Sequence, residues 1–398
     1  MRRKAVLWMI LTPLVFCMAG CTGAVQDVKE VSKEEIPDTE AMAFVRDMKA
    51  GWSLGNTLDA YNGAGVSADD LSTETCWGNP NTTQEMIDAV QEAGFNTLRI
   101  PVTWHGHVVT DEDGSVSISS VWLDRVQEVV DYAYGNGMYV IINIHHDTDT
   151  EYGYYPDSAH YEKSEKFIRG IWTDLAERFK DYDSHLIFES MNEPRLVGTG
   201  YEWNFRESAA ECQDSIDCIN RLNQVFVDTV RDSGGGNADR YLMVPGYSAS
   251  LAGVMTDLFI LPDDSAKDRL IISAHAYTPY NFALQPQEES GATDRFSVQD
   301  VSSTKEIDST MQQLFKKFVS QGIPVVIGEY GARNKNDNLE DRVQYYTYYV
   351  TAARQKGITC CVWDNGAFGG NGEQFGLLRR RQKKMEYPDI INAIMEHA

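Results

Sequence analysis

Two glutamates each stand at the end of an apolar, strand-like stretch of this chain. Glu193 follows "HLIFESMN" and precedes Pro194, which cannot donate a hydrogen bond in a sheet and is therefore expected to end the strand. Glu329 stands near the end of "PVVIGEYG", before Tyr330 and Gly331. Two carboxyl groups in different surroundings can hold different protonation states at one pH. Such a pair supplies an acid and a base or nucleophile, which is the equipment for cleaving a glycosidic bond.

Side chains that can bind or tune a carboxylate occur near the same stretches. Arg99 lies within "NTLRIPV", which is otherwise apolar. A cation within a few ångströms lowers the pKa of a carboxyl group by roughly 1–3 units, so Arg99 beside one glutamate would keep that glutamate ionised. The other glutamate, without such a partner, would stay protonated. Further polar residues at the ends of these stretches are His145, His146, Asn192, His275 and Tyr277.

Aromatic residues near the same ends offer flat faces on which sugar rings can stack. They are Trp77, Trp104, Trp363 and the group "YGYY" at 152–155. Each polar or aromatic residue, taken alone, is more often a cap, a hydrogen-bonded filler or part of the core. Their number favours a functional site, because a buried polar group costs free energy unless it has a partner.

Eight apolar stretches rich in β-branched residues alternate with segments of helical spacing. The stretches are 51–58, 96–102, 139–146, 186–194, 241–247, 270–277, 324–331 and 359–366. They are continuous apolar runs, which indicates strands buried on both faces, as in a parallel sheet covered by helices. Eight such units predict a (β/α)8 TIM barrel, an α/β fold with one catalytic domain and its site at the carboxyl ends of the strands. No GxGxxG or P-loop follows any stretch, which argues against an open nucleotide-binding sheet.

The segments between these stretches carry start and stop signals of helices. In "TTQEMIDAVQEAGF", Thr82 and Glu85 match a capping box, Ile87 and Val90 form an apolar face, and Gly94 is expected to end the helix. This pattern predicts an amphipathic helix that packs against the barrel.

The first residues have the features of an export signal. "MRRKAVLWMILTPLVFCMAGC" has a basic start, an apolar stretch and small residues before Cys21. Its end, from Met18 to Cys21, resembles a bacterial lipoprotein signal, in which the cysteine is lipidated and becomes the new N-terminus; plain secretion is the alternative. We expect a signal peptide at 1–20, a flexible spacer at 21–40 and the catalytic barrel at 41–398, exported and anchored by lipid to the bacterial cell envelope.

The composition fits a globular protein and limits its partners. The 398 residues are 42% hydrophobic and 24% charged, and the formal net charge is −24. This surplus of acidic residues makes nucleic acid a poor partner and helps to keep an exported protein soluble. We expect a monomer that uses no cofactor.

The cysteines and histidines show no metal-binding spacing. Cys212 and Cys218 could close a small disulfide loop, whereas the pair 360–361 lies in an apolar strand and is expected to serve packing. Adjacent residues on a strand point to opposite faces, so His145 and His146 can share a metal only if the strand has already ended. Metal catalysis is therefore disfavoured, and a calcium ion that stiffens a loop remains open.

The chain resembles the glycoside hydrolases of family 5, which include many bacterial endo-β-1,4-glucanases. The resemblance covers about residues 41–395. It rests on "GWSLGNTLDA", "WGNP", "FNTLRIPVTW", "INIHHD", "FESMNEPR", "AHAYTPYNF" and "VIGEYGA", which occur in the family's order. "GNTLDA", "ETCWGNP" and "FESMNEPR" together are similar to the endoglucanases and xyloglucanases of subfamily 4.

The resemblance implies a role for each candidate residue. Glu193 is implied as the general acid/base and Glu329 as the nucleophile. Asn192 would bind the sugar 2-hydroxyl, and Trp363 would form the floor of the subsite next to the bond that is cleaved. Arg99, His145, His275 and Tyr277 would orient or tune the nucleophile, and Asn56, Trp77, Trp104 and His146 complete the expected substrate-binding set.

The implied activity is that of a retaining endo-β-1,4-glucanase acting on cellulose, xyloglucan or mixed-linkage glucan. A β-mannanase or glucomannanase of the same family, and a catalytically silent polysaccharide-binding lipoprotein, are the alternatives; the second would lack one of the two glutamates. Retaining enzymes hold their carboxyl groups roughly 5–5.5 Å apart and inverting ones roughly 6.5–9.5 Å. Because the barrel interior is filled by side chains, we expect the shorter distance. The preferred glucan depends on loops at 60–76, 148–165 and 284–304 and stays open.

Overall fold

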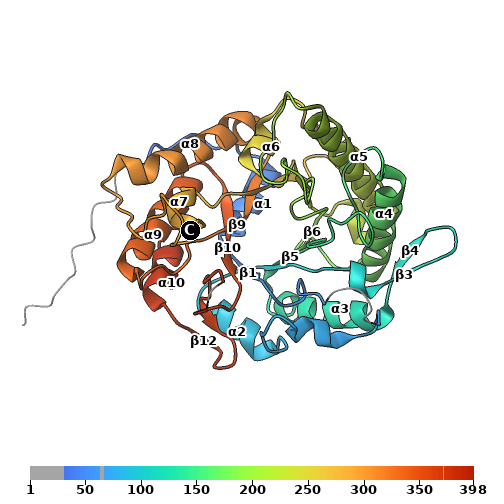
Figure 1. Ribbon diagram of the computed structural model, residues 1–398, viewed down its shortest axis with the longest axis horizontal. Coiled ribbons are helices and arrows are strands. Elements are labelled where there is room, and N and C mark those ends of the chain that lie inside the picture. The colour runs from blue at the N-terminus through green and yellow to red at the C-terminus, as the bar shows by residue number, and fades with distance from the viewer. Residues whose placement is uncertain (1–30, 63–66, 371) are drawn as a thin grey trace, which may run out of the picture.

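Eight parallel strands close into a barrel, which confirms the predicted (β/α)8 fold. The computed structural model describes residues 31–62, 67–370 and 372–398 (Figure 1). The strands of the barrel are β1 (Ala50–Leu54), β2 (Thr97–Ile100), β5 (Tyr139–Asn143), β6 (Leu186–Glu189), β7 (Leu242–Pro245), β8 (Leu270–His275), β9 (Val325–Tyr330) and β10 (Thr359–Asp364). Around the barrel they follow the order β1-β10-β9-β8-β7-β6-β5-β2. Seven of them lie within a predicted apolar stretch, and β1 begins one residue before its stretch, at Ala50.

Helices surround the barrel and follow the strands in sequence (Figure 1). They are α1 (Glu40–Asp47), α2 (Gln84–Glu92), α3 (Ser120–Tyr134), α4 (Tyr161–Arg178), α5 (Ala210–Asp232), α6 (Leu251–Met255), α7 (Tyr280–Ala283), α8 (Val301–Lys317), α9 (Leu339–Arg354) and α10 (Pro388–Met395). Two short hairpins lie outside the barrel, β3 (Val108–Thr110) with β4 (Val116–Ile118) and β11 (Leu378–Arg379) with β12 (Lys384–Met385).

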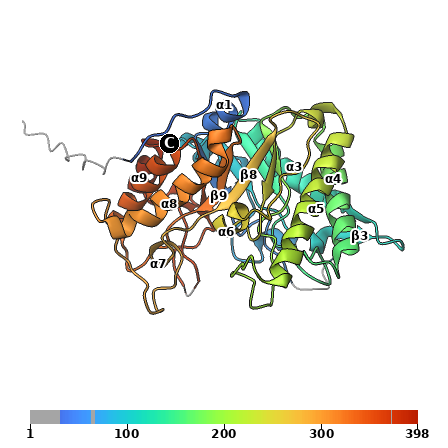
Figure 2. The same ribbon diagram turned by 90° about the horizontal axis from the view of Figure 1, so that it is seen from above.

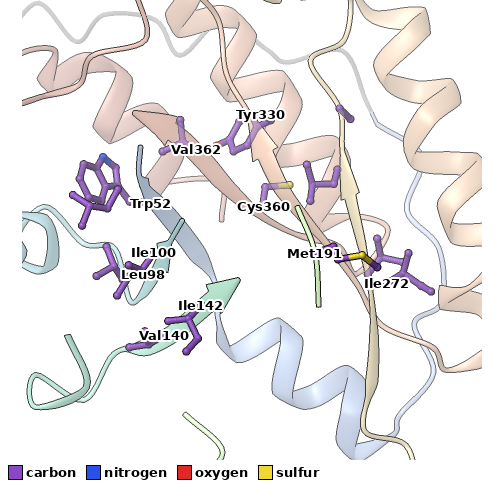
Figure 3. Close-up of a cluster of buried hydrophobic side chains, with 14 of the residues drawn as sticks. Trp52, Leu98, Ile100, Val140, Ile142, Met191, Ile272, Tyr330, Cys360 and Val362 are labelled. Carbon is purple, nitrogen blue, oxygen red and sulfur yellow. The ribbon is translucent and has the colours of Figure 1, made fainter. Parts of the chain in front are cut away.

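Both faces of the strands are buried, which explains why the strands read as continuous apolar runs. One set of side chains packs between the barrel and the helices, and Figure 3 shows ten of them labelled: Trp52, Leu98, Ile100, Val140, Ile142, Met191, Ile272, Tyr330, Cys360 and Val362. The alternate side chains, such as Ile141 and Ile187, fill the interior. Parallel strands covered by helices bury both faces in this way.

Helix α1 closes the N-terminal end of the barrel (Figure 2). Its buried residues Ala41 and Val45 pack in the same cluster as the interior side chains of the strands. The hydroxyl of Thr359, the first residue of β10, donates a hydrogen bond of 2.6 Å to the carbonyl of Val45. The opposite end, where the strands finish, is therefore the one left for a site.

Strand β6 ends earlier than its proline predicts. The strand finishes at Glu189, whereas we expected it to continue to Pro194. Beyond Glu189 only single backbone bonds reach the neighbouring strands, from Ser190 N–H to Met243 at 3.0 Å and from Asn192 N–H to the chain after β5 at 2.8 Å. Glu193 consequently stands on the first part of a loop above the rim.

The predicted capping box at Thr82 is wrong. Helix α2 begins one residue later, with Thr83 as its N-cap, and it has no side-chain capping bond. The backbone N–H of Thr82 donates instead to Glu74 at 2.7 Å, so this tertiary contact replaces the local one. Gly94 follows the end of the helix with a φ of 107°, as expected of a glycine that stops a helix.

The suggested disulfide between Cys212 and Cys218 is also wrong. Both cysteines lie on α5, and both thiols are free. Six residues of helix rise about 9 Å, which exceeds the reach of a disulfide between Cα atoms. The pair 360–361 is buried on β10, which confirms its packing role.

The last part of the predicted spacer is packed on the barrel. The ammonium group of Lys356, just after α9, donates 2.7 Å to the carbonyl of Ser32, and Glu34 N–H donates to Gln355 at 3.3 Å. The side chain of Ile36 lies against Gly357. The signal peptide and Cys21 lie outside the described residues. In the described part of the chain, every helix is too short or too polar to cross a membrane.

Candidate active site

A cleft of about 1080 Å³ opens at the carboxyl ends of the barrel strands. Ten of the predicted site residues line it: Asn56, Trp77, His145, His146, Asn192, Glu193, His275, Tyr277, Glu329 and Trp363. Arg99 lies buried directly below them and contacts Glu329. The barrel therefore brings together residues that are far apart in the sequence.

The two predicted carboxylates face each other across this cleft. An oxygen of Glu193 and an oxygen of Glu329 lie within 4.8 Å of each other and of a nitrogen of His275. Nδ1 of His275 is 2.8 Å from Glu193 and 3.8 Å from Glu329. The two carboxyl groups are thus close together, which is in line with the short separation expected of a retaining glycosidase.

Glu329 is held by three neighbours. Arg99 donates to its Oε1 at 2.9 Å, and the hydroxyl of Tyr277 donates to its Oε2 at 2.9 Å. Burial and the charge of Glu329 raise the pKa of Tyr277 well above its usual range, so this hydroxyl keeps its proton. Burial and the charge of nearby His146 hold the pKa of His145 well below its usual value, which leaves a neutral imidazole 4.0 Å from Glu329.

Glu193 has charged partners, contrary to the expectation that it would stand alone and protonated. Its carboxylate bonds to His275 and lies 3.8 Å from the guanidinium of Arg195. Burial raises the pKa of Glu193, but the hydrogen bond to His275 and the nearby positive charges outweigh burial and hold that pKa below its usual value. Glu193 and His275 thus act as one hydrogen-bonded pair at the cleft.

The pairing of His275 predicts a pH-dependent contribution to stability. Burial opposes a charged imidazole, yet the carboxylates of Glu329 and Glu193 raise the pKa of His275 above its usual value. A raised folded-state pKa contributes stability below the unfolded-state pKa, and that stability is lost as pH rises through the folded-state value. We expect His275→Gln to lower the free energy of unfolding more at about pH 5.5 than at about pH 9. Urea unfolding of both proteins at the two pH values checks this, and an equal or larger loss at the higher pH would contradict it.

The tryptophans Trp363 and Trp77 present faces to the cleft on the side of Asn56. The ring of Trp363 lies parallel to that of His145, with centroids 5.8 Å apart. A Cβ at Gly55 would come within 2.5 Å of this indole, so only glycine allows the ring to lie there. The indole N–H of Trp77 donates to the carbonyl of Tyr61 at 3.2 Å, which leaves the Trp77 ring face exposed.

Trp104 and the 152–155 group do not line the cleft, which corrects their assignment as sugar platforms. Trp104 is fully buried, and its indole N–H donates to the carbonyl of Asn143 at 2.9 Å. Its backbone N–H is fixed by Asp147 at 2.9 Å, so the chain after β2 turns this ring into the core. Tyr154 and Tyr155 are buried as well.

Four further residues contribute to the site that were not among the predicted site residues. Arg195 directly follows the motif that carries Glu193, and its guanidinium carbon lies 3.9 Å from the ring centroid of Trp203. Trp203 and Tyr280 line the cleft and are 63% and 50% exposed, which is unusual for large aromatics and favours a binding role. Glu189 lies below the cleft, bonded to Arg99 at 2.9 Å. A charged residue inside an apolar strand is a signal that could have identified it.

Two clusters at the site contain donor atoms of the types that bind metals. Within the described residues, Asp59 groups with His145 and His146, and Glu193 groups with His275 and Glu329. Because β5 ends at Asn143, the two histidines follow the strand and their rings converge, with centroids 4.4 Å apart. Asp59 already accepts the backbone N–H groups of residues 56 and 57, at 3.0 and 2.6 Å. Hydrogen bonds within the protein thus account for this aspartate, and a reaction without cofactor stays the prediction.

Comparisons with known proteins agree with the fold and identify a family for the chain. Residues 60–369 match the family model described as cellulase, glycosyl hydrolase family 5. Endoglucanase B of Neocallimastix patriciarum is 41% identical over 368 residues, which cover 92% of this chain and 73% of that protein.

Solved structures are similar over almost the whole chain. A glycoside hydrolase family 5 lichenase from Caldicellulosiruptor sp. F32, in complex with cellotetraose, is 54% identical with a TM-score of 0.89, covering 93% of this chain and 99% of that one. A GH5-4 broad specificity endoglucanase from Ruminococcus champanellensis with bound cellotriose is 42% identical with a TM-score of 0.82, covering 91% and 100%. The chain belongs to the cellulases of glycosyl hydrolase family 5.

Proposed function

We propose that this protein is a retaining endo-β-1,4-glucanase in which Glu193 is the acid and base and Glu329 the nucleophile. The observation that carries the proposal is the pair of carboxyl groups with oxygens within 4.8 Å, placed at the floor of an open cleft. The substrate class is supported by relatives named endoglucanase and by similar structures that hold cello-oligosaccharides.

In the first step Glu329 attacks the sugar. A carboxylate oxygen of Glu329 bonds to the anomeric carbon while the glycosidic C–O bond breaks, and its electron pair passes to the leaving oxygen. That oxygen takes a proton from Glu193, which His275 contacts at 2.8 Å. Asn192 lies beside Glu193, and its Oδ1 accepts from Arg99 at 2.7 Å, which turns its amide N–H₂ toward the cleft to donate to a sugar hydroxyl.

In the second step water releases the sugar. Glu193 now accepts a proton from water, and the water oxygen attacks the anomeric carbon as the ester C–O bond breaks and its electron pair returns to Glu329. Two inversions at the same carbon give net retention of the β configuration. Tyr277 and Arg99, each 2.9 Å from Glu329, stabilise the carboxylate that is regenerated.

Exposed aromatics on two sides of the rim support an internal cut in a long chain. Trp77 follows β1, whereas Trp203 follows β6, and these strands are separated by β2 and β5 on the shorter way around the barrel. The two carboxyl groups line the same cleft as these rings. Sugar units can therefore stack on both sides of the bond to be cleaved, as an endo-acting enzyme requires.

The purified chain from residue 22 onward, assayed on a panel of polysaccharides, tests this proposal. We expect hydrolysis of carboxymethyl-cellulose, mixed-linkage glucan or xyloglucan, with viscosity falling faster than reducing ends appear. Proton NMR of a cello-oligosaccharide digest should show the β-anomer first. Release of the α-anomer first, or cleavage of mannan with no cleavage of β-1,4-glucans, would contradict the proposal.

We further propose that the enzyme is exported and anchored to the cell envelope through a lipid on Cys21. The support for this proposal is the basic, apolar and small-residue pattern of residues 1–20. β-Glucans are too large to enter a cell, so the proposed substrate also requires an enzyme outside it.

Replacement of Cys21 by serine should abolish lipid attachment and leave the rate of hydrolysis unchanged, since the packed barrel begins well after this residue. Metabolic labelling with a fatty acid, followed by assay of the labelled and unlabelled proteins, measures both. Label that persists on the serine variant would show that Cys21 is not the attachment site.

A further inference from the structure

A third carboxylate, Glu189, lies below the two that face the cleft. It is the last residue of β6, and its side chain has no exposure to solvent. Its carboxylate accepts from Arg99 Nε at 2.9 Å, from Asn143 Nδ2 at 3.0 Å and from the hydroxyl of Ser273 at 2.5 Å. Every one of these donors is buried, so Glu189 does not meet substrate or water.

Arg99 is shared between Glu189 and Glu329. Its guanidinium is fully buried and lies 2.8 Å from Glu189 and 2.9 Å from Glu329. Among the described residues it is the only lysine or arginine within 4.0 Å of either carboxylate. Arg99 thus contacts two carboxylates at once.

The proposed reaction changes this balance of charge. When Glu329 forms the glycosyl ester it loses its negative charge, whereas Arg99 keeps its positive one. A buried cation without a counter-ion is strongly unfavourable. Glu189 is the group that remains to pair with Arg99 in the ester, because its hydrogen bonds and its position are independent of the substrate.

We propose that Glu189 is a positioning residue that acts through Arg99, as the permanent counter-ion that keeps Arg99 paired while Glu329 is held in the neutral ester. This inference rests on the proposed function. Arg99 contacts two carboxylates in the resting enzyme and one, that of Glu189, in the ester. Glu189 therefore favours ester formation without contact with the sugar.

The variant Glu189→Gln separates this role from a structural one. The amide has nearly the size of the carboxylate, and Arg99 remains paired with Glu329, so the resting protein should fold. Ester formation would then leave Arg99 unpaired, and we expect its rate to fall about 100-fold with little change in substrate binding. Ser273→Ala removes one hydrogen bond but keeps the charge of Glu189, and as the matched control it should change the rate by less than about 5-fold.

A slow-turnover substrate, 2,4-dinitrophenyl 2-deoxy-2-fluoro-β-cellobioside, measures ester formation directly. Mass spectrometry of the intact protein gives the labelling rate, and peptide mapping gives the site. We expect label on Glu329 in the wild type and in Ser273→Ala, and labelling slowed about 100-fold in Glu189→Gln. The label should raise the Tm of the wild type and lower that of Glu189→Gln, which a merely structural role of Glu189 would not produce.

The possible results separate the two proposals. Failure of the wild type to label at Glu329 would overturn the proposed function. A wild type that labels normally together with a folded Glu189→Gln that labels equally fast, or a Glu189→Gln that does not fold, would overturn the inference alone. Glu189→Asp keeps the charge and should label more than about 10-fold faster than Glu189→Gln; equal rates in these two variants would also contradict it.

Discussion

Glu329→Gly is expected to lose about 10⁵-fold or more of its activity on β-1,4-glucans, because no glycosyl ester can form without this carboxylate. The substitution also vacates the space from which Glu329 attacks. Azide can occupy this space, where Arg99 and Tyr277 offer the donors that now hold the carboxylate at 2.9 Å. Azide attack on an activated β-cellobioside from that face inverts the anomeric carbon once and gives the α-glycosyl azide.

The product of this rescue is identified by NMR, and Glu329→Gln is the matched control. The glutamine side chain fills the same space, so azide should restore no activity to that variant. A β-glycosyl azide from Glu329→Gly, or a variant that hydrolyses glucan at an appreciable fraction of the wild-type rate, would show that Glu329 is not the nucleophile.

Glu193→Ala should behave in a different way that depends on the leaving group. Loss of a general acid costs about 10²–10⁴-fold where the leaving oxygen needs a proton, as in glucan itself. With a dinitrophenyl leaving group, which departs without a proton, the ester on Glu329 should still form at a rate near that of the wild type. Azide then attacks this ester, and the second inversion gives the β-glycosyl azide.

Steady-state rates on glucan and on aryl cellobiosides of different leaving-group pKa check this expectation. The rate of Glu193→Ala should fall steeply as the leaving group becomes more basic, and the wild-type rate should change much less. The same azide anomer from the variants at Glu193 and Glu329 would overturn the assignment of the two roles.

The barrel could be predicted because its constraints are global. Strands such as β5 and β9 are buried on both faces, and strands buried in this way have continuous apolar sequences. The capping box at Thr82 and the disulfide between Cys212 and Cys218 were wrong because both were inferred from local spacing. The backbone N–H of Thr82 donates to Glu74, which replaces the capping box. Both cysteines lie on one helix, which excludes the disulfide.

The sequence allowed prediction of those site residues that lie at, or directly after, the carboxyl ends of barrel strands. Glu329 and His275 are brought together by strand register, which the topology determines, and Glu193 follows on the loop after β6. Trp104 was misassigned because sequence position does not tell which way a ring turns after its strand, and hydrogen bonds to Asn143 and Asp147 turn it inward.

The partners of Glu193 could not be predicted for a related reason. His275 reaches it from β8, and Arg195 reaches it from the loop beyond β6, so only the folded chain shows that Glu193 is paired. Trp203 lies on the same loop, where no periodic pattern indicates its exposure to the cleft.

The packing of the N-terminal segment has a practical consequence for immobilised enzyme. Ser32 and Ile36 are fixed beside Lys356 and Gly357, just before β10 begins, whereas the cleft lies where the strands end. A linker joined to residue 31 therefore leaves the molecule on the outer side of α8, where Val31 lies beside Lys305 and Asp308 and outside the cleft. Coupling to a bead through this terminus would attach every molecule at the same point outside the cleft, so that a polysaccharide chain can still enter the cleft. Coupling through random surface lysines would give no common orientation.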